Sequence, residues 1–242
     1  MCYCQAEAGC RQNQLATQKP QSQTPSGISS KAALAHERIE SLIVFCDLAP
    51  GAFVSEAMLA ELTGLGRTPV REALQRLAVE GMIEIHPKRG ILIAPLSVET
   101  QLQLLEVRRS LEGLAVRLAV ERSRARQRAE MAELVESLKA FSGDDPRAFA
   151  PLLKRSHGLI AAATRNPYLP IAMASLHGLS RRFWFANLHD VEADLREGAD
   201  LHVAMLTALS DQDLDKSVKA SQALNDYLVD FAYATVRPSS GG

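Results

Sequence analysis

Apolar residues recur at helical spacing over most of this 242-residue chain. Residues 31–47 place an apolar side chain at every third or fourth position, which predicts an amphipathic helix. Two more helices are expected over residues 56–63 and about 68–80. Ser55 is a typical N-cap for the first of them, and Gly64 and Gly81 end the two helices, since glycine adopts a left-handed backbone at little cost.

The pattern changes after the third expected helix. Short apolar runs at residues 82–85 and 91–94 predict two strands joined by a basic hairpin turn. From Ser97 onward the pattern is helical again, and we expect helices at 97–122, 124–142, 146–164, 168–188, 190–210 and 213–235. Residues 1–30 are rich in Gln, Ser and Thr, without periodic apolar positions, and are expected to be a disordered extension.

Residues 31–95 have the layout of a winged helix-turn-helix. A helix, a glycine turn and a second helix with Pro69 in its first turn are followed by the predicted hairpin, whose basic tip spans residues 86–90. Arg67 and Arg71 lie four positions apart and share one face at the start of the second helix. Such a helix contacts bases in the major groove, so the layout predicts a DNA-binding protein.

The expected fold class is therefore mainly α: an N-terminal winged helix-turn-helix over residues 31–95, followed by an all-α helical bundle over 97–235. Composition agrees, because aromatic residues make up 5% of the chain, while alanine and leucine dominate the 47% that is hydrophobic. These values favour helices packed on helices.

Charge limits the kind of DNA binding expected. The whole chain carries a net charge of −1, and residues 31–98 carry seven Lys and Arg against eight Asp and Glu. A neutral domain binds non-specific DNA weakly, so tight and specific binding is expected to depend on dimerisation. No apolar run approaches the ~20 residues that span a bilayer. The first residues do not resemble a signal peptide, and a cytoplasmic location without a membrane partner is expected.

Three of the four cysteines lie in the N-terminal extension, at Cys2, Cys4 and Cys10. A Cys-x-Cys pair could bind metal, but no histidine is near it, and an incidental role is the preferred interpretation. Cys46 falls in the first helical pattern and is expected to be a small buried hydrophobic residue.

Several motifs carry a family resemblance over residues 31 to about 235. In the first half they are Pro50-Gly51, Leu59-Ala60-Glu61-Leu62, Arg67-Thr68-Pro69-Val70-Arg71-Glu72-Ala73-Leu74 and Arg89-Gly90. In the second half they are Glu106-Val107-Arg108, with Glu112 four residues on, and Asn166-Pro167-Tyr168-Leu169. Together they resemble transcription regulators of the GntR family, in the FadR-like subgroup with an all-helical C-terminal effector-binding domain.

The resemblance implies a homodimer that binds a short palindromic operator in double-stranded DNA. Most such proteins are repressors that a small carboxylate metabolite releases. Arg71 is expected to contact guanine, with Arg67 sharing base and phosphate contacts, while Thr68 and the helix N-terminal amides hold a phosphate. The expected wing residues, which contact phosphates or the minor groove, are His86, Lys88, Arg89 and the tightly turning Gly90.

Two positions depart from the family pattern. Gly66 stands where the family usually has serine or threonine, so one hydroxyl contact to phosphate is missing. Ala57 stands where some relatives place a base-contacting arginine. The operator sequence is therefore expected to differ from that of better-known relatives.

For the effector, the resemblance and residue chemistry indicate Arg108, with His157 and His202 as companions. An alternative for Arg108 is a structural ion pair with Glu112 or Glu106. Three consecutive aromatic residues offer either core and dimer packing or a wall for an apolar ligand: Phe183, Trp184 and Phe185.

Many members of the subgroup bind a divalent metal through an aspartate, a histidine four residues later, and two more histidines. His157 and His202 fit the two middle positions, but Leu153 and Leu224 occupy the outer ones, with Asn225 beside the latter. Two imidazoles without a carboxylate make a poor site, so no metal or other cofactor is expected. A different ligand set could use His177 and His189, although lone histidines are more often packed or on the surface.

The competing hypothesis is a helical enzyme or metal-binding protein whose first domain only dimerises. It requires a complete ligand or catalytic set in residues 97–235. That segment has no Glu-x-x-His or His-Glu-x-x-His pattern, no glycine-rich phosphate loop and no nucleophile elbow. Enzyme activity is therefore not expected, and a ligand-controlled transcription regulator is the preferred hypothesis.

Overall fold

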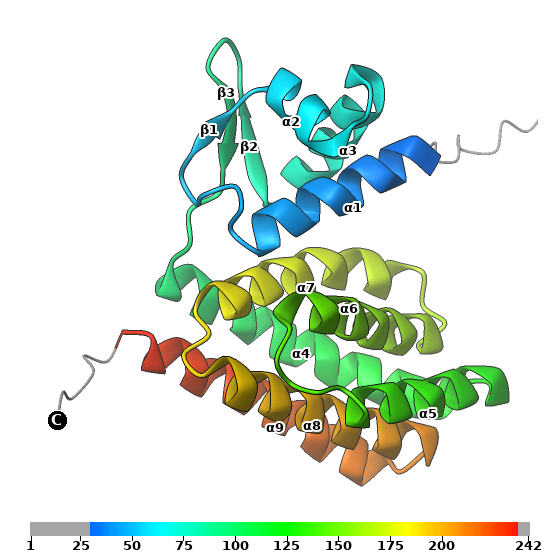
Figure 1. Cartoon of the computed structure of the whole chain (residues 1–242). Helices are drawn as coiled ribbons and strands as arrows, with labels where there is room; N and C mark the ends of the chain where they lie inside the picture. Colours follow the sequence, from blue (N-terminus) through cyan, green and yellow to red (C-terminus); the bar gives the residue numbers. More distant parts are fainter. Residues whose placement is uncertain (1–29, 237–242) are drawn as a thin grey trace, which may run out of the picture.

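The computed structural model describes residues 30–236, so residues 1–29 of the predicted N-terminal extension, with its three cysteines, lie outside them. The chain first forms an N-terminal unit, shown from blue to cyan-green in Figure 1. Its elements are α1 (Ser30–Val44), β1 (Phe53–Val54), α2 (Glu56–Thr63), α3 (Arg67–Val79), β2 (Ile83–His86) and β3 (Gly90–Ile93).

The helical unit follows and lies below the N-terminal unit in Figure 1. Its elements are α4 (Val98–Arg122), α5 (Ala125–Lys139), α6 (Pro146–Ala163), α7 (Tyr168–Ala186), α8 (Val191–Ser210) and α9 (Leu214–Ala234). Each unit surrounds its own hydrophobic core. The predicted mainly α fold is confirmed, and from residue 98 to 236 the structure contains no strand. None of the helices described is long and apolar enough to cross a membrane.

Local signals set the helix-turn-helix geometry. The Ser55 side chain accepts a hydrogen bond from the Met58 amide and so caps α2. Gly64 ends α2 in the left-handed region, with φ of 63°. The inner face of α3 then buries Val70, Leu74 and Leu77, as its apolar spacing predicts.

The hairpin belongs to a three-stranded antiparallel sheet with the strand order β1-β3-β2. The two predicted strands are confirmed, but β1 was not predicted, because two residues are too few to show an alternating pattern. Phe53 and Val54 pair with β3 and hold the wing against the start of α2. Gly90 begins β3 with φ of 106°, and a Cβ there would lie 2.8 Å from the carbonyl oxygen of Val54.

The first helix is shorter than predicted. It ends at Val44 rather than at residue 47, and Cys46 has a left-handed backbone with φ of 58°. The chain leaves the helix because Leu48 turns back into the core, where it is buried and its amide bonds to the carbonyl of Leu42. The prediction that Cys46 is a buried helical residue is therefore wrong: its side chain is half-buried outside the helix.

The two units meet where α1 and the sheet end lie against α7 (Figure 1). Ser175 Oγ donates to the carbonyl of Glu80, and Arg182 donates to the carbonyl of the residue after β3. Gly178 allows close approach, since a Cβ there would lie 2.6 Å from the Met82 side chain. Hydrogen bonds from α7, and the absence of a Cβ at Gly178, thus position the N-terminal unit.

Replacing Gly90 by alanine is expected to destabilise the wing by ~1–3 kcal/mol, because the new Cβ meets Val54 and the backbone is left-handed. Gly113→Ala is the matched control, since a Cβ at this position in α4 meets no neighbour. It is expected to stabilise the protein by roughly 0.5–1 kcal/mol. Equilibrium urea unfolding of both variants checks the difference, and equal stabilities would contradict the prediction.

Candidate nucleic-acid interface and buried polar cluster

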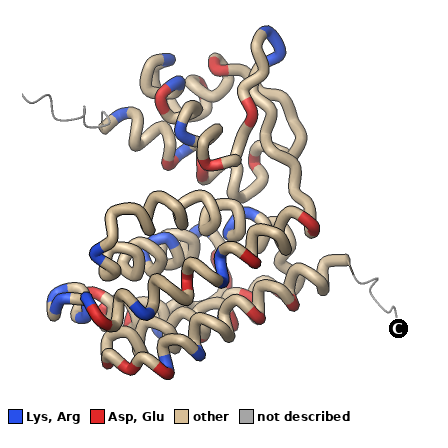
Figure 2. The backbone as a smooth tube through the Cα atoms, turned by 180° about the vertical axis from the view of Figure 1, so that it is seen from behind, with Lys and Arg blue, Asp and Glu red and all other residues tan. Residues whose placement is uncertain are grey.

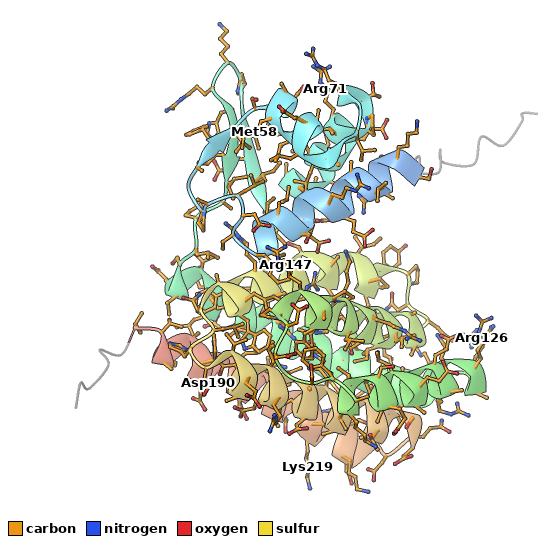
Figure 3. The ribbon with its side chains drawn as sticks, viewed as in Figure 1. Met58, Arg71, Arg126, Arg147, Asp190 and Lys219 are labelled. Carbon is orange, nitrogen blue, oxygen red and sulfur yellow. The ribbon has the colours of Figure 1, made fainter. Side chains whose placement is uncertain are left out.

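The N-terminal end of α3 forms an exposed basic surface. Arg67, Thr68 and Arg71 are all exposed there. Figure 3 shows Arg71 at the end of the molecule farthest from the helical unit, pointing outward. Its Nε donates to Glu56 Oε2 at 2.8 Å, which orients the side chain while leaving it 63% exposed. Ala57 is exposed on α2 nearby and offers no polar group.

The wing places a second set of cations at the same end, and Figure 2 shows Lys and Arg at its tip. Lys88 occupies the left-handed turn position, with φ of 67°. The Arg89 guanidinium lies 5.2 Å from the centre of the Phe53 ring, a cation–π distance. His86 packs edge-on against the same ring and lies 3.1 Å from Glu84 Oε2. Two polar surfaces, the start of α3 and the wing, therefore face the same side.

A buried polar cluster lies inside the helical unit. The structure brings Arg108 of α4, His157 of α6 and His202 of α8 together, each at most 6% exposed. Other members come from α4, α7 and α9. The cluster comprises Arg108, Glu112, His157, His177, Ser180, His202 and Asn225.

The sequence left two roles open for Arg108, a structural ion pair and a place in a ligand cavity, and the structure combines them. Its Nε donates to Glu112 Oε1 at 3.0 Å, so the ion pair within α4 exists. Its Nη1 donates to Ser180 Oγ at 2.8 Å, and its Nη2 lies 3.4 Å from His157 Nε2. The guanidinium also lines a cavity of about 20 Å³, bordered further by His202 and Trp184. That volume holds about one water molecule.

His177 and Asn225 belong to the cluster although neither was among the predicted site residues. His177 Nε2 lies 3.0 Å from Glu112 Oε1, and its ring stacks on His157 with centroids 3.9 Å apart. Asn225 Nδ2 donates to Glu112 Oε2 at 2.6 Å. His189 is exposed and lies outside the cluster, so the alternative ligand set that paired it with His177 does not form.

Burial keeps the three histidines neutral near pH 7. It lowers the pKa of His177 and of His202 to about 4, and it lowers the pKa of His157 well below the usual value. Burial alone would raise the pKa of Glu112, but Arg108 and the hydrogen bond from His177 outweigh this effect and hold its pKa far below the usual range. The cluster thus contains one full ion pair and three uncharged imidazoles.

One buried nitrogen atom of the three imidazoles has no hydrogen-bond partner among the described residues. His202 Nδ1 lies 2.7 Å from the carbonyl oxygen of Gly198 and donates to it, so Nε2 is an acceptor. This Nε2 faces His157 Nε2 at 3.4 Å. His157 Nδ1 has no protein partner among the described residues. A buried polar atom without a partner beside a cavity is suited to bind a ligand.

The donor set does not fit a divalent metal ion. Ligand atoms of Glu112, His157 and His177 lie within 4.8 Å of one another, a spacing that could hold an ion. However, the guanidinium of Arg108 contacts both Glu112 and His157, and both carboxylate oxygens already accept hydrogen bonds. Leucine side chains line the cavity at the two positions where the resemblance places an aspartate and a histidine, Leu153 and Leu224. An added metal cation would also lie beside the positively charged guanidinium of Arg108, which disfavours it.

Comparison with known proteins identifies both units. Residues 103–226 match the model of the FCD domain, and residues 32–93 match that of bacterial regulatory proteins of the gntR family. The chain belongs to the GntR family. This GntR protein is a transcription regulator and not an enzyme, which excludes the competing hypothesis of a helical enzyme.

The names of two relatives and one solved structure support this assignment. The Nta operon transcriptional regulator of Aminobacter aminovorans is 29% identical over 164 residues, covering 66% of this chain and 75% of the relative. The transcriptional repressor RspR of Escherichia coli is 37% identical over 89 residues, or 37% of this chain and 35% of RspR. The solved structure of E. coli McbR/YncC shares the fold, with a TM-score of 0.69 at 22% identity over 86% of this chain and 99% of that one.

Acid is expected to destabilise this GntR protein through its buried histidines. The folded-state pKa of His202 is about 4, against about 6.5 for an ordinary histidine, so the unfolded chain binds more protons between these values. Stability therefore falls as pH drops from about 6.5 to 4, by up to about 3 kcal/mol for this group. The variant His202→Asn keeps an N–H for Gly198 and does not titrate.

We expect His202→Asn to lose less stability than the wild type between pH 7 and pH 4.5 in urea unfolding. The exposed His189 provides the matched control, since His189→Asn should keep the wild-type pH dependence. The same loss in all three proteins would show that His202 is not held neutral by burial.

Proposed function

We propose that this regulator is a cytoplasmic repressor that binds a palindromic operator as a homodimer. Residues 31–95 contact the DNA, while residues 97–235 bind the effector and dimerise. The exposed start of α3 beside a basic wing carries the DNA-binding part of this proposal. Repression is supported by the relative RspR, a transcriptional repressor that is 37% identical to this chain over 89 residues.

The geometry supports a defined set of DNA contacts. With α3 in the major groove, Arg71 donates two hydrogen bonds to the O6 and N7 of guanine. The hydrogen bond from its Nε to Glu56 leaves both Nη groups able to donate to guanine, and it orients the side chain before DNA binds. Arg67 shares base and phosphate contacts, and Thr68 with the helix amides holds a phosphate. The wing contributes Lys88, Arg89 and His86 to phosphates or the minor groove.

Arg71→Ala is expected to weaken binding to a specific duplex by about tenfold or more, because each arginine–guanine pair contributes ~1–3 kcal/mol of discrimination. The duplex is one that the wild-type protein selects from a random pool, and fluorescence anisotropy measures its affinity. Arg126→Ala is the control, since Arg126 is exposed in α5 and bonds only to Glu130 there. Failure to select any preferred sequence, or equal binding by Arg71→Ala, would contradict DNA recognition by α3.

The effector we propose is a small carboxylate. Its binding site is the cavity beside Arg108, His157 and His202, where a buried guanidinium can donate to a carboxylate. The small volume of the cavity means that the helices must separate slightly to admit a ligand. Binding would then favour one arrangement of the two units over another.

A panel of carboxylates and their neutral amides tests whether the effector is a carboxylate, with melting temperature and DNA release as the readouts. We expect a carboxylate to raise the melting temperature and release the selected duplex, whereas its amide does neither. Arg108→Lys keeps the charge but loses the planar fork, so it should weaken the response about tenfold. Arg117→Lys changes an exposed arginine of the same helix and should respond like wild type. Equal responses to acids and amides would rule out a carboxylate effector.

A further inference from the structure

Glu40 of α1 places its carboxylate in a pocket formed by the helical unit. The residue is 7% exposed. Its Oε1 accepts a hydrogen bond from Arg181 Nη2 at 2.7 Å, and its Oε2 accepts one from Lys154 Nζ at 2.5 Å. Arg181 belongs to α7 and Lys154 to α6, so both cations come from the other unit. The carboxylate stays ionised, because these two cations outweigh the effect of burial and lower its pKa.

Arg181 stands between this contact and the buried polar cluster. It lines the small cavity beside Arg108 and His157, and it also borders two larger clefts between the units, of about 410 and 510 Å³. The larger cleft reaches His157 and His177 from the side of the N-terminal unit. Its volume lies in the range of small-molecule sites, whereas the small cavity holds about one water. A ligand that enters through this cleft and reaches the buried polar cluster would therefore pass Arg181.

The charges around Arg181 are balanced only by the N-terminal unit. Within this group the helical unit supplies three cations, Arg108, Arg181 and Lys154, but one carboxylate, Glu112. Burial and, less strongly, the like charge of Arg108 lower the pKa of Arg181, and the carboxylates that oppose this, Glu40 and Glu80, are both in the N-terminal unit. Arg181 and Lys154 form ion pairs with Glu40 alone among the described residues, so without Glu40 these two cations are left to pair with another anion.

We propose that Arg181 and Lys154 form a carboxylate-binding site that Glu40 fills in the ligand-free protein. A carboxylate effector competes with Glu40 for Arg181. When the effector wins, Glu40 keeps Lys154, whose side chain is 50% exposed, and His36 of its own helix, and the ion pair between α1 and α7 is lost. Effector binding is thereby coupled to the position of the N-terminal unit. This inference rests on the proposed carboxylate effector.

The variant Glu40→Gln tests the competition, because it removes the built-in carboxylate while its amide oxygen can still accept a hydrogen bond from Arg181. Isothermal titration with acetate and with succinate is expected to show about tenfold tighter binding to this variant than to wild type. Arg181→Lys should bind both probes about tenfold more weakly than wild type. Circular dichroism and melting curves confirm that each variant is folded.

Asp47→Asn is the matched control. Asp47 also bonds across the two units, to Arg147, and this pair is exposed. Arg147 lines the outer cleft of about 410 Å³ but not the small cavity beside the cluster. Figure 3 shows Arg147 at the boundary between the units. The variant should bind acetate and succinate like wild type. Equal binding of both probes to Glu40→Gln, Asp47→Asn and wild type would overturn the inference.

The two proposals fail differently. If carboxylates release DNA from wild type but Glu40→Gln binds them no more tightly, the proposed effector class stands and the competition is refuted. If no carboxylate releases DNA from wild type while Glu40→Gln binds acetate or succinate tightly, the anion site stands and the proposed effector class is refuted.

Discussion

The pairing of buried charge is the constraint on which the arrangement of this protein depends. A guanidinium left unpaired in the interior costs several kcal/mol, so Arg108 and Arg181 each require a carboxylate. Arg108 finds Glu112 one turn further along its own helix, and this pair organises the centre of the helical unit. Arg181 finds Glu40 in the other unit. The Arg108 pair therefore stabilises the bundle, and the Arg181 pair joins the two halves of the molecule. A third buried guanidinium, Arg182, donates to the carbonyl of Ala94 instead.

The winged helix-turn-helix could be predicted because its determinants are local. Ser55 caps α2, Gly64 ends it, and Gly90 turns the wing with a left-handed backbone, so each feature depends on a few neighbouring residues. The same locality explains what was missed. The strand β1 has two residues and exists only through its partner strand, and the early end of α1 depends on where Leu48 packs. Tertiary contacts decide such details.

The buried polar cluster was predicted only in part, for the same reason. Arg108, His157 and His202 were identified from a family pattern, but His177 meets Glu112 across 65 positions, and Arg181 meets Glu40 across 141. No spacing rule connects residues so far apart. One usable signal was present: α7 carries polar and charged side chains among apolar ones, and polar groups on a buried helix need partners.

The helix α7 carries two adjacent rows of side chains. Ser175, Gly178 and Arg182 face the N-terminal unit, whereas His177 and Trp184 face the interior of the bundle. Apart from Arg181, which lines the cavity and also bonds to α1, the rows are separate. Substitutions along the inner row can therefore adapt the cavity to a different molecule while the outer row stays unchanged. Related regulators could thus diverge in what they detect and inherit the same mechanical link to their DNA-binding unit.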